Sequence, residues 1–155
     1  MLTLYGFEQP DQLALPGFEV ETAPIEILNR RTLGKLGEFT VWRALEAAGY
    51  QVKRARMFQG DLRAISPDGE IFHVEVKTAR RGGDGKWRAC LYKRGHADHK
   101  HADVVVLLAV CGVQAVPFVI PASRLPGRQC VITSDPQRYA GRLAVYRRDA
   151  LMSLA

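Results

Sequence analysis

The stretch DLRAISPDGEIFHVEVKT, residues 61–78, predicts a β-hairpin on which the interpretation of the whole chain depends. Two strand-like runs, residues 61–65 and 71–78, flank a turn. Pro67 presets φ for a type I turn, and Gly69 can adopt the left-handed conformation that closes a three-residue loop with a G1 bulge. The turn therefore predicts which residues of the two strands face each other.

A three-residue loop sets the register of this hairpin. Ser66 then pairs with Glu70, and Asp61 lies opposite Glu75 on one face, with their Cβ atoms about 5 Å apart. A four-residue loop would instead place Asp61 beside Val74, pointing to the other face. The turn chemistry thus favours two carboxylates side by side.

Strand alternation adds a lysine to the two carboxylates. His73, Glu75 and Lys77 share one face of the second strand. The pattern also fits an amphipathic strand with a solvated face. Asp61 directly across from Glu75, however, would destabilise a sheet because like charges face each other. Paired carboxylates suit a divalent cation such as Mg²⁺ or Mn²⁺, so the hairpin predicts a metal site.

A helix is expected before the hairpin, at residues 31–48. Its apolar residues recur at helical spacing, Asn29 or Thr32 can cap its start, and Gly49 stands where a glycine ends a helix. Glu38 lies at the margin of the apolar stripe. It is either a half-buried salt-bridge partner or part of a site.

The remaining segments predict an α/β domain with a mixed sheet. Residues 104–110 form a continuous apolar run that is typical of a strand buried on both faces. Pro117 places the strand at residues 115–120 at an edge or a bulge. Further strands are expected at residues 50–56 and 86–92, and a short terminal helix at residues 149–154.

Three sequence elements together resemble the PD-(D/E)XK nuclease superfamily, and more closely its small Holliday-junction resolvases and intron-homing endonucleases. They are Asp61, the tripeptide Glu75-Val76-Lys77 and the helical pair Gly37-Glu38. The resemblance covers about residues 30–125. The literal Pro-Asp of the superfamily's name occurs as Pro67-Asp68, but this pair lies in the turn, several strand residues of about 3.3 Å each from the lysine. Asp61 therefore takes the role.

The resemblance implies a restriction-endonuclease-like three-layer core, with a central mixed β-sheet flanked by helices. It also implies that Asp61, Glu75 and the backbone carbonyl of Val76 hold Mg²⁺, for which Mn²⁺ can substitute. Lys77 would position the attacking water and offset charge on the phosphorane. Glu38 would bind a second ion or orient the lysine. Junction resolvases act as symmetric dimers, so the resemblance also implies a homodimer.

The charge distribution points to a polyanionic partner. The chain has 155 residues, enough for one domain with a real core, and a net charge of +6. Residues 1–29 contain five acidic residues and no Lys or Arg, so residues 30–155 hold all 22 basic residues against 11 acidic ones. Such a basic body favours nucleic acid, although a surplus that serves solubility is the alternative.

Basic residues around the hairpin are candidates for phosphate contacts, although each alone is also consistent with an ordinary surface charge. They are Lys53, Arg54, Arg56, Arg80, Arg81, Lys86, Arg88, Lys93, Arg94 and Lys100. The polar run His96-Ala97-Asp98-His99-Lys100-His101-Ala102-Asp103 fits no zinc pattern and favours an exposed loop.

The first 24 residues predict an acidic arm and residues 25–155 the single nuclease domain. Within the arm, Gln12-Leu13-Ala14-Leu15-Pro16 is similar to short peptides that bind bacterial sliding clamps, although a packed extended segment is the alternative. Three cysteines without CxxC spacing favour a reducing cytoplasm. There is no signal-peptide pattern and no apolar run long enough to span a membrane.

These observations predict a Mg²⁺-dependent DNA endonuclease that acts on branched DNA such as a Holliday junction, because the chain has little room for a sequence-reading domain. Two alternatives stay open. One is a homing or restriction-type endonuclease on the same fold. The other is a non-catalytic nucleic-acid-binding module.

Overall fold

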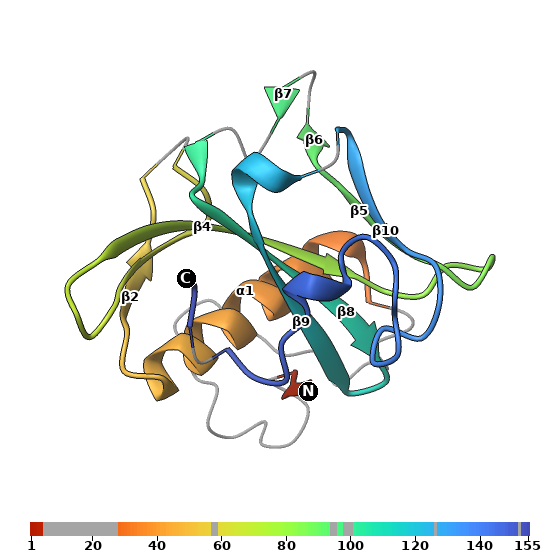
Figure 1. Cartoon of the computed structure of the whole chain (residues 1–155), viewed down its shortest axis with the longest axis horizontal. Coiled ribbons are helices and arrows are strands. Elements are labelled where there is room, and N and C mark those ends of the chain that lie inside the picture. Colours follow the sequence, from red (N-terminus) through yellow and green to blue (C-terminus); the bar gives the residue numbers. More distant parts are fainter. Residues whose placement is uncertain (5–27, 57–58, 94–95, 98–100, 126, 152) are drawn as a thin grey trace.

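A mixed six-stranded sheet with one long helix on one face organises the chain (Figure 1). The computed structural model describes residues 1–4, 28–56, 59–93, 96–97, 101–125, 127–151 and 153–155. The elements are β1 (Leu2–Thr3), α1 (Arg30–Ala47), β2 (Gln51–Arg54), β3 (Leu62–Ile65), β4 (Ile71–Ala79), β5 (Trp87–Cys90), β6 (Tyr92–Lys93), β7 (His96–Ala97), β8 (Val104–Cys111), β9 (Gln114–Pro121) and β10 (Gln129–Ile132), with short 3₁₀ turns at Ala122–Arg124 and Ala144–Tyr146. The main sheet has the order β1-β9-β8-β4-β3-β2, in which the β4–β8 pair is parallel and the other pairs are antiparallel.

Helix α1 begins and ends at the residues that its caps favour. The Asn29 side chain accepts a hydrogen bond of 2.9 Å from the Thr32 amide, which satisfies one of the free N–H groups of the first turn. Gly49 has φ of +88°, the left-handed conformation of a residue that follows a helix end. The predicted helix is confirmed, displaced by one residue at each end, with Asn29 as its cap.

The hairpin has the predicted register. The Gly69 amide donates to the Ser66 carbonyl at 2.9 Å, and Gly69 has φ of +87°. Leu62 pairs with Val74 and Ile65 with Ile71, as the three-residue loop requires. Asp61 immediately precedes β3.

The sheet separates two apolar cores. On β4, Val74 and Val76 pack with the leucines of α1, whereas Ala79 packs on the opposite face. Every residue of the predicted central strand, residues 104–110, is buried, and β8 lies between β4 and β9, which confirms its place. β1 pairs with β9 at Gln114 and Ala115, so β9 is the second strand of the sheet and not the edge strand that its proline indicates; Pro117 itself lies beyond the two residues that β1 pairs with.

A close contact fixes α1 on the sheet. A Cβ at Gly37 would lie 1.8 Å from Thr78 Oγ1 of β4, so the helix can approach the strand this closely only with glycine there. Gly37 therefore brings the next residue, Glu38, down to the level of the sheet.

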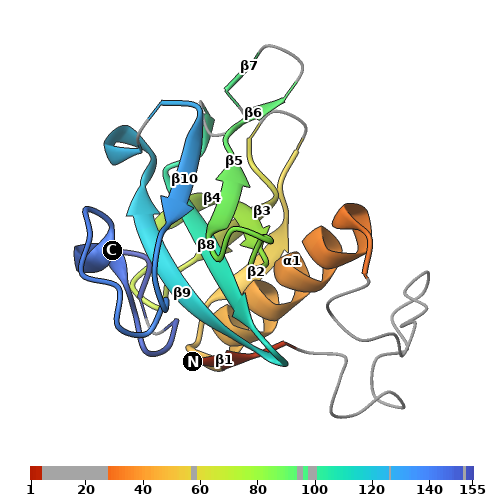
Figure 2. The same ribbon diagram turned by 90° about the vertical axis from the view of Figure 1, so that its right-hand side faces the viewer.

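The second face of the sheet differs in detail from the expectation of flanking helices. It is covered by the two-stranded sheet of β5 and β10, whose Trp87, Ala89, Cys130 and Ile132 pack on β8 and β9 (Figure 2). The α/β class with a mixed central sheet is confirmed, but its third layer is mainly β-structure.

The expected terminal helix is wrong. The described residues from Asp149 to the end of the chain contain no helix, although Leu151 and Leu154 are both buried. A helix this short is marginal on its own, and the chain end instead docks by burying both leucines. The Leu154 amide also donates to the Tyr50 hydroxyl at 3.1 Å.

The first four residues belong to the folded body. Leu2 and Thr3 form β1 on the edge of β9, and Leu4 is fully buried in the core beneath α1. The rest of the predicted acidic arm and the clamp-like peptide at residues 12–16 lie outside the described residues. No helix among the described residues is both long and apolar enough to cross a membrane.

Candidate active site

Strands β3 and β4 separate at Asp61, and the predicted site lies at this fork. The Asp61 amide, one residue before β3 begins, donates to the Val74 carbonyl at 2.9 Å. At Gly60, which has φ of +85°, the backbone turns away from β4. A Cβ on this residue would lie 2.8 Å from the same Val74 carbonyl oxygen. Glycine is therefore required for β3 to leave β4 at this point.

The Asp61 carboxylate continues the sheet where the strand stops. Its Oδ2 accepts a hydrogen bond of 2.7 Å from the Val76 amide of β4. The N–H and C=O of a strand residue point to the same edge, so the Val76 carbonyl also faces the fork. The predicted metal ligands Asp61 and Val76 are thus adjacent at one strand edge.

Glu75 and Lys77 form an ion pair on the face of β4 away from α1. Lys77 Nζ lies 2.8 Å from Glu75 Oε1, and only 9% of the Glu75 side chain and 18% of the Lys77 side chain are exposed. Burying a carboxylate requires a compensating charge, which the lysine supplies. The paired register of the hairpin ends at Leu62 and Val74, so Asp61 and Glu75 are the residues just beyond the last pair.

Glu38 reaches the site from α1. Arg54 Nη1 lies 3.3 Å from Glu38 Oε2, so the predicted salt-bridge partner exists. The pKa of Glu38 is nevertheless raised above its ordinary value of 4.5, first by burial and then by the negative charge of Asp61. Glu38 is therefore both a salt-bridge partner and electrostatically coupled to the fork.

These donors suit a hard cation. The fork gathers carboxylate and carbonyl oxygens, the ligands that Mg²⁺ uses together with water and substrate phosphates. Within the described residues no group of three or more His, Cys, Asp or Glu side chains is arranged to hold a metal ion. A site of this kind would depend on two carboxylates and on ligands from outside the protein.

Several candidate phosphate contacts are engaged within the protein. Arg80 donates to the Leu28 carbonyl at 2.7 Å and so ties the end of β4 to the segment before α1. The Arg81 guanidinium lies 5.8 Å from the centre of the Trp87 ring. Arg54 is the partner of Glu38, but 69% of its side chain is exposed, so it can also reach a ligand.

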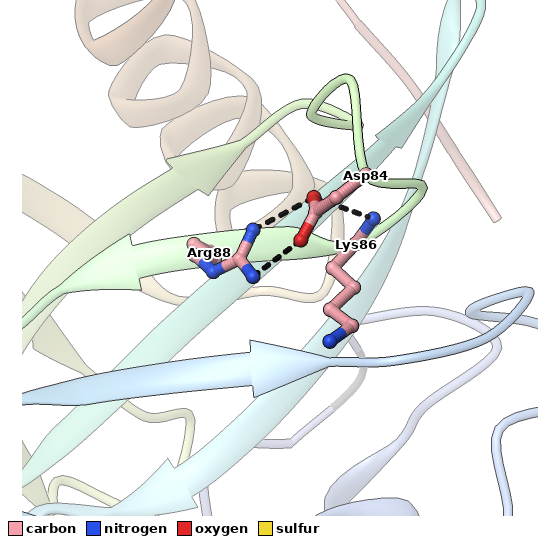
Figure 3. A network of polar contacts seen from close by, with 3 residues as sticks. All are labelled: Asp84, Lys86 and Arg88. Atoms are coloured by element: carbon pink, nitrogen blue, oxygen red, sulfur yellow. Dashed lines mark hydrogen bonds and ion pairs between the residues drawn. The ribbon is translucent and has the colours of Figure 1, made fainter.

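Arg88 is held by a two-point contact with Asp84 in the loop before β5 (Figure 3). This contact is the main reason that the pKa of Asp84 falls to about 2. The Lys86 amide also approaches Asp84, at 3.4 Å, while its side chain extends away (Figure 3).

Two of the remaining basic candidates are exposed, and the side chains of the other three lie outside the part of the chain that the structure describes. Lys53 and Arg56 are exposed. The side chain of Lys93, and Arg94 and Lys100, lie outside the described residues.

The polar run before β8 contributes one contact that the sequence did not predict. Asp103 Oδ2 accepts from the His73 amide at 2.7 Å and lies 3.2 Å from His73 Nδ1. Alternation put His73 on the face of Glu75, but its partner comes from the parallel pairing of β4 with β8, for which the sequence carried no local signal. His101 is exposed, and Asp98 and His99 lie outside the described residues.

The fold is similar to a solved nuclease structure. It aligns with the structure of a bacterial homing endonuclease, I-Ssp6803I, with a TM-score of 0.59 and 17% sequence identity, over 77% of this chain and 89% of that one. The sequence matches no known family profile and no curated protein. At this identity the likeness shows a shared fold, and it confirms the expectation of a nuclease-like α/β fold.

Proposed function

We propose that this chain is a Mg²⁺-dependent DNA endonuclease that hydrolyses phosphodiester bonds. The observation that carries the proposal is the fork between β3 and β4. There the Asp61 carboxylate is bound to the Val76 amide, and the buried Glu75–Lys77 pair stands on the adjoining face. The fold shared with a homing endonuclease supports it.

Each residue of the fork has a task in such a reaction. Asp61, Glu75 and the Val76 carbonyl would hold Mg²⁺, with Mn²⁺ as a substitute. The ion supplies Lewis-acid activation of the phosphate and of a bound water. Lys77 orients that water and balances the charge that develops on the phosphorane. Glu38 would hold a second ion; its coupling to Asp61 favours this role over orienting Lys77, because that lysine stands on the face of β4 away from α1.

The proposed substrate is branched DNA bound by a homodimer. The described elements form one compact sheet-and-helix unit, without a separate sequence-reading domain among them. The homing endonuclease on the same fold supports the alternative of a sequence-specific enzyme. Cleavage of four-way junctions, flaps and plain duplex, compared at equal concentrations, separates the two.

The catalytic assignment is tested with Glu75→Gln, which keeps the shape of a buried side chain. Cleavage with Mg²⁺ should fall to background, and Lys77→Met should lower kcat by about 100-fold or more. Glu70→Gln is the matched control, since Glu70 is an exposed glutamate at the start of the same strand segment. Denaturation in urea confirms that each variant folds.

Metal dependence is tested on the same substrates. Mg²⁺ and Mn²⁺ should support cleavage, and a chelator should abolish it. Cleavage that persists unchanged in folded Glu75→Gln would overturn the assignment and leave the chain as a non-catalytic nucleic-acid-binding module.

A further inference from the structure

A cross-strand pair lies beside the fork on the face of the hairpin that carries Glu75. Arg63 and His73 pair directly, and Glu75 follows two residues after His73 on β4. This is the face away from α1. His73 therefore stands one strand repeat of about 7 Å from Glu75.

His73 is fixed in place from the next strand. The Asp103 amide donates to the His73 carbonyl at 2.8 Å, while Asp103 Oδ2 accepts from the His73 amide. The same oxygen lies 3.2 Å from Nδ1, and a carboxylate can only accept, so Nδ1 carries a hydrogen. Nε2 is the other ring nitrogen, and it donates to an anion when it carries a hydrogen as well, as in the imidazolium.

Arg63 is a second donor beside His73. Among the described residues its guanidinium has no ion pair, and its side chain is partly exposed between the strands. An arginine opposite a histidine gains nothing from its cross-strand neighbour. An anion that contacts both would make the pair favourable, and the planar guanidinium suits phosphate oxygens.

We propose that Arg63 and His73 form a phosphate-binding pair that holds the backbone phosphate next to the one being cleaved, with Asp103 as a positioning residue for His73. The inference rests on the proposed endonuclease function and deepens it. The pair lies one strand repeat from Glu75, a step comparable with that between successive phosphates of a nucleic-acid strand. It fixes the path of the DNA strand along the hairpin, from the fork toward the turn.

The test measures DNA binding and its salt dependence in a Glu75→Gln background, so that the probe, a labelled DNA duplex, stays intact. Arg63→Ala should weaken binding and lower the slope of log Kd against log salt by about one phosphate contact. His73→Gln should weaken binding in the same direction. Arg43→Ala on α1, an exposed arginine on the other face of the sheet, is the control and should leave the slope unchanged.

Kinetics with Glu75 intact separate binding from catalysis. Loss of a contact to a neighbouring phosphate should raise KM and leave kcat nearly unchanged. Asp103→Ala should reproduce the KM increase of His73→Gln, and the double variant should be no worse than either single one. Asp103→Asn, which keeps a carbonyl acceptor, should restore part of the loss.

The outcomes distinguish this inference from the proposed function. If the parent chain cleaves DNA while the folded Arg63 and His73 variants keep its salt slope and KM, the phosphate pair is wrong and the endonuclease stands. If the parent chain cleaves no substrate but Arg63→Ala still lowers the salt slope, the phosphate pair stands and the endonuclease is wrong.

Discussion

The Asp61 carboxylate accepts a backbone hydrogen bond that a neighbouring strand would otherwise accept. Where β3 departs, the Val76 amide would lose its partner, and the Asp61 carboxylate accepts its hydrogen bond instead. A buried donor left without a partner would cost about 1–3 kcal/mol, so this contact stabilises the fork as well as orienting the carboxylate. One oxygen of Asp61 is thereby committed to the backbone.

The raised pKa of Glu38 predicts a pH effect on stability. In the unfolded chain the carboxyl titrates near 4.5, and in the folded chain at a higher pH. The folded state therefore binds more protons across this window, and the free energy of unfolding falls as pH rises through it. Glutamine does not titrate, so Glu38→Gln lacks this decrease. The free energy of unfolding of Glu38→Gln, taken relative to that of the parent, should therefore increase with pH. Urea denaturation between about pH 4 and pH 8 measures the difference.

Added Mg²⁺ extends the same experiment to the role of Glu38. If Glu38 helps to hold an ion, Mg²⁺ at neutral pH should stabilise the parent more than Glu38→Gln. Glu46→Gln, on an exposed glutamate of the same helix, controls for the loss of a helix charge. Parallel pH profiles for the parent and Glu38→Gln would contradict the prediction.

At the scale of elements, two glycines of similar conformation differ in what surrounds them. Gly60 and Gly69 both have positive φ, so alanine at either should lower the free energy of unfolding by about 1–2 kcal/mol. A Cβ at Gly69 meets nothing within 4 Å, whereas a Cβ at Gly60 would lie 2.8 Å from the Val74 carbonyl. Gly60→Ala should therefore also push β3 off β4 at the fork.

The two variants should separate in activity. Displacing Asp61 by about 1 Å is expected to lower kcat by about 100-fold in Gly60→Ala, because a small misplacement of a reacting group is costly. Gly69→Ala is the matched control and should keep kcat near that of the parent. Cleavage at saturating Mg²⁺, with urea denaturation alongside, makes the comparison. A Gly60→Ala protein with the kcat of the parent would show that the fork tolerates movement.

The sequence could predict contacts between residues close in the chain, but not pairings between segments far apart in it. The helix caps and the hairpin register depend on residues a few positions apart, such as Asn29 with Thr32 and Ser66 with Gly69, so the pattern contained them. The pairing of β10 with β5 joins segments about 40 residues apart. No local spacing marks such a partner, and strand β10 was not predicted.

The same limit applied to the candidate site. Asp61, Glu75 and Lys77 belong to one hairpin, and their arrangement followed from its turn. The bond of Asp103 to His73 needs the parallel β4–β8 pair, and the engagement of Arg80 with Leu28 needs the segment before α1. Basic side chains in particular could be counted from the sequence, but their partners could not.

At the scale of the whole molecule, the acidic residues near the N-terminus and the basic body predict competition for the same surface. Residues 1–4 are anchored, with the N-terminal amine bonded to the Asp149 carbonyl at 2.9 Å and Leu4 fully buried. Deleting the segment through residue 24 would remove part of the fold as well as the charges. Substitution is therefore the cleaner change.

Neutralising Glu8, Glu19 and Glu21 by glutamine raises the net charge from +6 to +9. If the acidic segment masks the DNA-binding face, this variant should bind duplex DNA several-fold more tightly at low salt. The gain should vanish near 1 M salt, where charges are screened beyond about 3 Å.

A second variant with the same net charge decides whether position matters. It carries Glu46→Gln, Glu70→Gln and Asp149→Asn, which remove three exposed acidic residues of the folded body. If DNA affinity depended on net charge alone, it would rise equally in both variants, because long-range attraction of the DNA depends on the total field of the protein. Masking predicts the larger gain for the N-terminal set, since only those charges would occupy the place of the DNA. Equal affinities, measured by titration of the labelled duplex, would therefore rule out masking and leave net charge as the cause.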